Sequence, residues 1–266
     1  MSLDISHILD GWPYEPGHVT VRRIRGDKGQ PLIQLRLDLG LLQMRTTGRP
    51  DGRRPHGHES LLHYYQHKLQ KHTDSRGGEE GFSLDEKACE LLRAEGVMYY
   101  HRYLAEFILE DYQAVYRDTE RNLQLMDFCA KYAKELSDRY LLEQYRPYVV
   151  MMYTRAQAHI ELGRGHPKVA RAIVQEGIGK IEAFYRRFDQ AELAEDSSEI
   201  AILRALAKEI EGKIPVDPIV KLKRALNKAV AEERYEEAAI LRDKLQRATH
   251  LSPSKPPGEA RDTGHP

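Results

Sequence analysis

The sequence predicts a mainly α-helical protein with a small antiparallel β element near its N-terminus. Apolar residues between positions 33 and 39 alternate with polar ones, which is the period of a strand. From Ser83 onward, apolar residues recur at helical spacing, and short turns at Glu110 and Gly163 separate the helices. Residues 216–250 form two short amphipathic segments with a polar turn between them, a pattern typical of an antiparallel helical hairpin.

The bulk composition limits the classes of function. Hydrophobic residues make up 41% and charged residues 31% of the 266 residues, as in a globular, helix-rich protein. Lys+Arg and Asp+Glu both number 41, so attraction to nucleic acid would need a local basic patch. No apolar stretch approaches the roughly 20 residues of a membrane span, and we identify no signal peptide. We therefore predict a cytoplasmic protein, with Cys89 and Cys129 reduced and partly buried.

Residues 1–72 are predicted to contain the β element, a basic loop and a short helix. A strand begins near His18, residues 26–29 form a glycine turn, and a second strand covers residues 33–39 with one face buried and one face wet. Gly40 bends the chain before residues 41–44, so we expect a hairpin or a three-stranded meander packed on helices. An irregular loop covers residues 46–58, a helix residues 59–71, and a polar linker residues 73–81.

The helical body is expected over residues 83–212. Ser83 and Glu86 have the spacing of a capping box, which predicts a helix from there to Ile108. Further helices are predicted over residues 112–136, from Pro147 to Gly163, over residues 167–189, and from a Ser198 cap to Gly212.

Short turns between these helices favour antiparallel neighbours. The pairs around Asp111 and Gly163–Gly165 weakly resemble a tetratricopeptide array. However, their spacing exceeds that family's period of about 34 residues, and its Trp-Leu-Gly-Tyr pattern is missing. A superhelical array and an ordinary helical bundle both remain open.

The C-terminal hairpin begins at Asp217–Pro218, where Asp suits the cap and Pro the first turn. Its apolar positions repeat at helical spacing, and the pair Ala238–Ala239 would let the two helices approach closely. A unit of about 30 residues is too small to bury its own apolar stripe, so it must dock on the rest of its own chain, on a second copy of itself or on a partner protein. Residues 251–266 are rich in Pro, Gly and charge, and we expect a disordered tail there.

The segment Tyr235–Asp243, with its aromatic-Glu pair, double Ala and Arg-Asp, resembles the UVR motif of the UvrB and UvrC repair proteins. Residues 222–226 fit the first helix of that motif, whereas Tyr235 stands where the family usually has Phe. The resemblance implies a protein-binding role, since such hairpins join UvrB to UvrC and similar ones occur in adaptors of Clp-type chaperones and their kinases. Self-association is a further option. The predicted partner-binding residues are Leu222, Leu226, Tyr235, Glu236, Ala238, Ala239, Leu241, Arg242, Asp243 and Leu245.

A nucleic-acid-binding function is the alternative from another class. Four arginines in the loop, Arg45, Arg49, Arg53 and Arg54, could hold an anion. We expect these side chains to be exposed, so replacing Arg49, Arg53 and Arg54 with Ala should change stability little. The other interpretation is a solvated turn that ties the sheet to the helices. The hairpin adds the basic residues Lys221, Lys223, Arg224 and Lys228.

Enzymatic chemistry is not favoured, because the sequence has no phosphate-binding Gly-Lys-Thr loop and no recognisable catalytic set. His63 and His67 lie one helical turn apart, but the zinc-protease pattern is absent, so we predict a solvated histidine face and neither metal nor cofactor. The remaining enzyme hypothesis places a site between sheet and helices. The many tyrosines at helical spacing, including Tyr100, Tyr103, Tyr145 and Tyr148, suit partial burial or a ligand or peptide groove.

Overall fold

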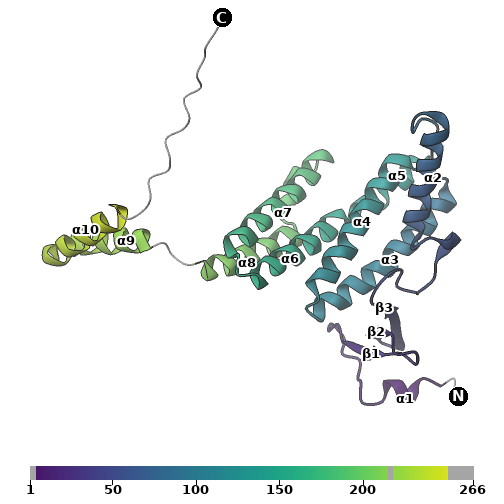
Figure 1. Cartoon of the computed structure of the whole chain (residues 1–266), viewed down its shortest axis with the longest axis horizontal. Coiled ribbons are helices and arrows are strands. Elements are labelled where there is room, and N and C mark those ends of the chain that lie inside the picture. Colours follow the sequence, from purple (N-terminus) through teal and green to yellow (C-terminus); the bar gives the residue numbers. More distant parts are fainter. Residues whose placement is uncertain (1–3, 215–217, 251–266) are drawn as a thin grey trace, which may run out of the picture. The chain divides into compact units, whose positions relative to one another are not determined.

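The computed structural model describes residues 4–214 and 218–250. The chain divides into two compact units, Met1–Lys213 and Ile214–Pro266. In the first unit, a three-stranded sheet and a series of packed helices share one body, and the second unit contains an antiparallel pair of helices (Figure 1). The predicted fold class, mainly α with a small β element and a terminal hairpin, is confirmed.

The sheet is a three-stranded antiparallel meander in the order β1-β2-β3, one of the two predicted arrangements. β1 covers Val21–Arg25, β2 Pro31–Leu37 and β3 Gly40–Arg45, and a four-residue helix, α1 (Ser6–Leu9), precedes them. Gly29 has φ 74°, and its amide donates to the Gly26 carbonyl at 2.8 Å, which closes the turn between β1 and β2. The first strand begins three residues later than expected.

The prediction that one face of β2 is exposed to solvent is wrong, because all four residues 32–35 are buried. On one face, Ile33 and Leu35 pack with Met44 of β3 and with Ala105 of α3 (Glu86–Ile108). Gln34 is buried through side-chain hydrogen bonds with Gln43 at 2.8 Å and Arg22 at 2.7 Å. The expected alternation fails at its end as well, where Leu39 lies in a turn and is 92% exposed.

The loop after the sheet contains a short 3-10 turn, η1 (Pro55–Gly57), and leads into α2 (Leu61–Arg76). Ser60 caps α2 by accepting from the His63 amide at 3.2 Å, and left-handed Gly77 ends the helix. The helix therefore runs into the segment predicted as a linker and stops at the first glycine.

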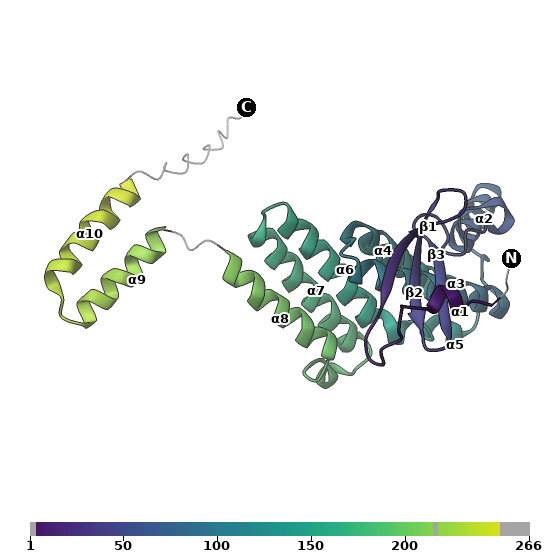
Figure 2. The same cartoon turned by 90° about the horizontal axis from the view of Figure 1, so that it is seen from below.

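The long helices after α3 pack in chain order. These are α4 (Tyr112–Tyr132), α6 (Arg146–Gly163), α7 (Pro167–Arg187) and α8 (Ser198–Lys213). α3 packs on α4, α4 on α6, α6 on α7, and α7 on α8. Figures 1 and 2 show this succession as an open array with the sheet beside α3. Gly177 of α7 lets that helix approach Thr154 of α6, since a Cβ at Gly177 would lie 2.4 Å from the threonine hydroxyl oxygen. Shorter elements lie between them: α5 (Leu136–Tyr140), η2 (Glu143–Tyr145) and η3 (Ala191–Ala194).

Two apolar cores stabilise the array. The larger is built from α6, α7 and α8 with contributions from α3 and α4, and it includes fully buried Met151, Ile181 and Leu203. The smaller joins α2 to α3 and α4, and it contains both Cys89 and Cys129, which are free, as predicted, and more fully buried than predicted. No helix among the described residues is long and apolar enough to cross a membrane.

Three helix boundaries differ from the predicted ones because polar contacts decide them. Asp85, not Ser83, caps α3, since its carboxylate accepts from the Ala88 amide at 2.8 Å. α4 ends at Tyr132 because Ala133 is extended and forms a parallel bridge with Leu84. At α8, the hydroxyl of Ser197, not Ser198, accepts from the amide of Ile200 at 3.3 Å.

The second unit consists of α9 (Pro218–Ala231) and α10 (Tyr235–His250), which pack on one another. Glu233, at φ 57°, ends α9 in the left-handed conformation. The Arg234 amide donates to the Ala229 carbonyl at 2.8 Å, and the Glu233 amide donates to the Val230 carbonyl at 3.1 Å. This is a Schellman motif, which reverses the chain in three residues. The proposed Asp217 cap and the predicted tail at 251–266 lie outside the described residues.

Candidate functional site

The interior of the hairpin is formed by two alanines. Ala229 of α9 is fully buried and Ala238 of α10 is 7% exposed, so the helices approach each other at these small residues. Ala239 is exposed. The expectation that both Ala238 and Ala239 allow the close approach is therefore half wrong, because neighbouring residues on a helix point about 100° apart.

The predicted apolar seam is only partly covered by the hairpin itself. Four leucines, Leu222 and Leu226 on α9 and Leu241 and Leu245 on α10, are half-buried. Three further apolar side chains are more exposed still: Val230, Tyr235 and Ile240, with Tyr235 at 67%. Two helices alone cannot enclose these groups, so the second unit presents uncovered apolar surface.

The charges of the hairpin lie on its solvent side. Arg234 in the turn pairs with both Glu232 and Glu237, and Arg242 lies 3.5 Å from Asp243. Glu236 is exposed. The basic residues Lys221, Lys223 and Arg224 are exposed as well, and Lys228 lies 3.9 Å from Glu232.

The four loop arginines do not form a single exposed cluster. Arg53 and Arg54 are exposed, and Arg45 is exposed beside Gly52. The Arg49 side chain turns inward, where it is 12% exposed and its Nε lies 3.3 Å from Glu95 Oε1. The expectation that Arg49 is as dispensable for stability as its neighbours is corrected by this ion pair.

Sequence reasoning missed a buried charged network on α3 and α4. Arg102 is 1% exposed and forms a bidentate pair with Asp118, at 2.6 and 2.8 Å, while it also donates to the carbonyls of Arg45 and Gly48. Glu106 lies beside this pair, and its burial, with Asp118 adding to the effect, raises the pKa of its carboxyl to about 8. Arg102 links the loop to the body through the carbonyls of Arg45 and Gly48, while Oε2 of the buried Glu106 has no hydrogen-bond partner among the described residues.

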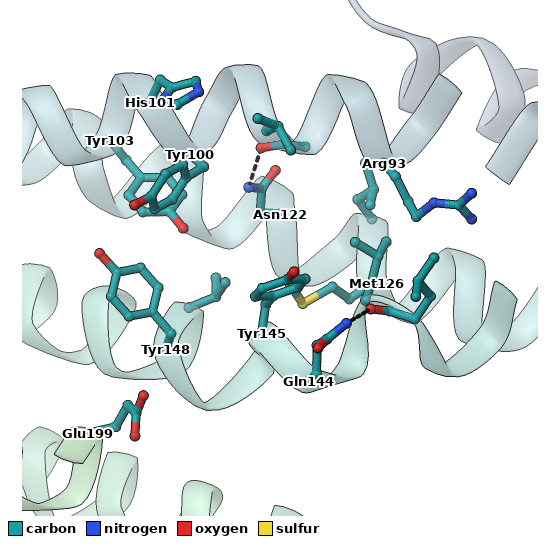
Figure 3. A pocket seen from close by; sticks show the side chains of 16 residues that line it. Arg93, Tyr100, His101, Tyr103, Asn122, Met126, Gln144, Tyr145, Tyr148 and Glu199 are labelled. Carbon is teal, nitrogen blue, oxygen red and sulfur yellow. Dashed lines mark hydrogen bonds between the residues drawn. The ribbon is translucent and has the colours of Figure 1, made fainter. Parts of the chain in front are cut away.

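The aromatic residues fall into separate settings. Tyr99 is buried in contact with the guanidinium groups of Arg102 and Arg121, at 4.9 and 4.0 Å from its ring centre. Tyr100, Tyr103, Tyr145 and Tyr148 instead line one groove of about 730 Å³ (Figure 3). Its polar lining residues, including Glu199, come from distant parts of the chain, which no sequence spacing indicates.

The histidine-rich segment forms ring contacts. His56 stacks on Tyr64 with ring centres 4.1 Å apart, and the rings of His58 and His67 lie 5.1 Å apart. Within the described residues, no group of three or more His, Cys, Asp or Glu side chains is arranged to hold a metal ion.

Comparison with known proteins identifies the hairpin. Residues 217–248 match the family model of the UvrB/uvrC motif, UVR, which covers α9 and most of α10. The resemblance predicted from Tyr235–Asp243 is thereby confirmed. No curated protein and no solved structure matches the chain, and the tetratricopeptide resemblance of the body stays a prediction.

Proposed function

We propose that this protein is a non-enzymatic adaptor that binds a protein partner through the apolar side of the α9–α10 hairpin. The half-buried leucines carry the proposal. Leu222 and Leu226 on α9 and Leu241 and Leu245 on α10 are only half-buried, and a partner that covers them would bury apolar area at about 25 cal/mol per Å². Charged residues lie around this seam, as in the polar rim of a protein interface.

The matched motif connects the proposal to two settings, DNA repair and the Clp-type stress machinery, because UVR hairpins occur in proteins of both. The proposal also keeps the cytoplasmic location predicted from the sequence. The free, buried thiols of Cys89 and Cys129 suit a reducing compartment.

The test compares partners captured from a cell extract by the full chain and by two hairpin variants, with quantitative mass spectrometry. Leu226→Asp places a charge in the seam, so partners should be lost. Lys223→Ala removes an exposed charge from the same helix and should retain them. Thermal unfolding of each variant verifies that the body is intact. If only Lys223→Ala loses its partners, the contact is electrostatic, and if both variants bind like the wild type, the hairpin is not the binding surface.

Self-association is examined with the same variants. A hairpin that pairs with a second copy through its leucines should give a concentration-dependent dimer in analytical ultracentrifugation. Leu226→Asp should then sediment as a monomer, and Lys223→Ala should remain dimeric. A wild-type chain that stays monomeric at all concentrations would assign the seam to a different protein.

A nucleic-acid role is the second candidate, favoured by the exposed Lys221, Lys223 and Arg224 on one short helix. Binding to a DNA duplex should then weaken steeply with salt, and replacing the three residues with Ala should flatten that dependence. Unchanged binding in this triple variant would exclude α9 as the contact.

A further inference from the structure

A groove of about 730 Å³ opens on the first unit, away from the UVR hairpin in sequence. α3 and the η2–α6 segment form its walls, and α4 contributes the apolar residues Leu125 and Met126. Figure 3 shows Tyr100, Tyr103 and Tyr148 at one end, Tyr145 in the middle and Arg93 at the other end. Apolar and aromatic side chains thus make up most of the lining.

The apolar surface continues beyond the groove. Among the lining residues, Val97, Leu141 and Tyr145 are each about half exposed. Directly before Leu141, α5 presents Leu136 and Tyr140, which are 64% and 51% exposed. Exposed apolar side chains both in the groove and on the adjoining α5 favour contact with a protein segment, because a small ligand in the groove would leave the α5 side chains uncovered.

The titratable side chains in the groove differ in whether their charge is already paired. Arg93 is neutralised by Asp138, with Nη1 and Oδ1 2.5 Å apart. Burial lowers the pKa of His101, which favours its neutral form. Glu199 accepts from the hydroxyls of Ser197 and Ser198, and within the described part of the chain it has no ion-pair partner. It lies in the first turn of α8, where the helix dipole favours a negative charge.

Aromatic rings accompany this carboxylate. The ring centres of Tyr100 and Tyr148 lie 6.0 Å apart, and Tyr103 meets Tyr100 edge-on at 5.6 Å. Burial, with the neighbouring Tyr100, raises the pKa of Tyr148 to about 12, so its ring is an uncharged phenol at neutral pH. The faces of such rings attract cations. The nearby guanidinium of Arg155 lies over Phe107, 4.1 Å from the ring centre, and does not line the groove.

We propose that this groove docks a segment of a partner protein that carries apolar anchor residues and a lysine or arginine. The anchors pack on Leu125, Met126 and the exposed α5 side, and the cation lies between Glu199 and the tyrosine rings. The body would then hold one protein while the hairpin binds another. This inference goes beyond the proposed hairpin function and does not depend on it.

The test selects binders from a random peptide library displayed on phage, with the full-length protein as bait. Selected sequences should combine several apolar residues with a lysine or arginine. The affinity of one synthetic selected peptide is then measured by fluorescence anisotropy. Tyr148→Ala and Glu199→Gln should each weaken binding by about tenfold, the effect of a lost cation–π or charge contact. Exposed Glu192→Gln on η3 and Leu226→Asp in the hairpin should leave the affinity unchanged.

A charge exchange separates recognition from misfolding. A peptide whose cationic residue is changed to Glu should not bind the wild type. The same peptide should bind the Glu199→Lys variant, because the two charges have been exchanged. The proposal is overturned if no sequence is enriched, if enriched sequences lack a basic residue, or if Tyr148→Ala and Glu199→Gln bind as tightly as the wild type. A peptide that loses affinity only with Leu226→Asp would overturn it as well and would support the hairpin alone.

Discussion

The Glu95 carboxylate accepts a hydrogen bond of 2.8 Å from the backbone amide of Leu61, a residue 34 positions earlier in the chain. Its second oxygen accepts from the Leu62 amide at 3.3 Å and pairs with Arg121. Glu95 is fully buried in α3. Its carboxylate therefore caps α2 from outside that helix, by accepting hydrogen bonds from first-turn amides that have no partner within α2. The two elements are thereby held together by a buried charge.

Replacing Glu95 with Gln should destabilise the body strongly. The amide keeps one acceptor for Leu61 but leaves Arg49 and Arg121 without their anion, and breaking a buried pair typically costs about 3–5 kcal/mol. Urea unfolding followed by circular dichroism measures the change. Glu90→Gln, on an exposed position of the same helix, is the control and should stay within about 0.5 kcal/mol of the wild type. Equal stability of the two variants would contradict the role assigned to Glu95.

Arg49 and Arg53 should differ although both belong to the basic loop. The Arg49 side chain is 12% exposed and lies beside Glu95, whereas that of Arg53 is 83% exposed. Arg49→Ala should cost about 1–3 kcal/mol because it removes a partner of a buried carboxylate, and Arg53→Ala should cost less than about 1 kcal/mol. The same unfolding experiment measures both. Similar small losses of unfolding free energy in the two variants would show that Arg49 contributes no more to stability than an exposed loop arginine.

The two neighbouring alanines of the hairpin should tolerate a large residue differently. Ala238→Leu should separate α9 from α10, with an overpacking cost of about 1–3 kcal/mol, because Ala238 is buried. Ala239 is exposed, so the leucine side chain of Ala239→Leu should point into solvent and leave the packing of α9 on α10 intact. Hydrogen exchange of the full chain, read on peptides from residues 218–247, should show faster exchange in the first variant only. If exchange were faster in the Ala239→Leu variant and not in Ala238→Leu, Ala239 would be the alanine that lies between α9 and α10.

Glu106 should make stability depend on pH. Burial raises the pKa of its carboxyl to about 8, so the folded state holds a proton that the unfolded state releases near its ordinary pKa of 4.5. More protons bound in the folded state mean that this contribution is present at low pH and is lost as pH rises through about 8. The urea midpoint of the wild type should therefore fall from about pH 5 to about pH 8. Glu106→Gln, which is neutral throughout, should show a smaller fall, and an identical pH dependence would contradict the assignment.

Local chemistry allowed much of the fold to be predicted from the sequence. Pro167 and Pro218 begin helices in the structure because proline fixes the φ of a first helical residue. The helix predicted to end at Gly163 does end there, although the left-handed glycine is Gly165. The meander followed from the period of two around Ile33 and the glycine turns. The boundaries that failed, at Asp85 and Ala133, depend on which of several local polar groups finds a partner elsewhere.

The hairpin was the part of the candidate site that the sequence by itself determined, since its apolar spacing and motif are contained in one continuous segment of the chain. The assignment of Ala238 to the interior and Ala239 to the surface was decided by the tertiary structure, because it depends on the rotation of α10 against α9. The same holds for Glu95 and Glu199. In the sequence, a carboxylate in the core and one beside a groove look like any charge on a solvated helix, and only the packing of distant helices distinguishes them.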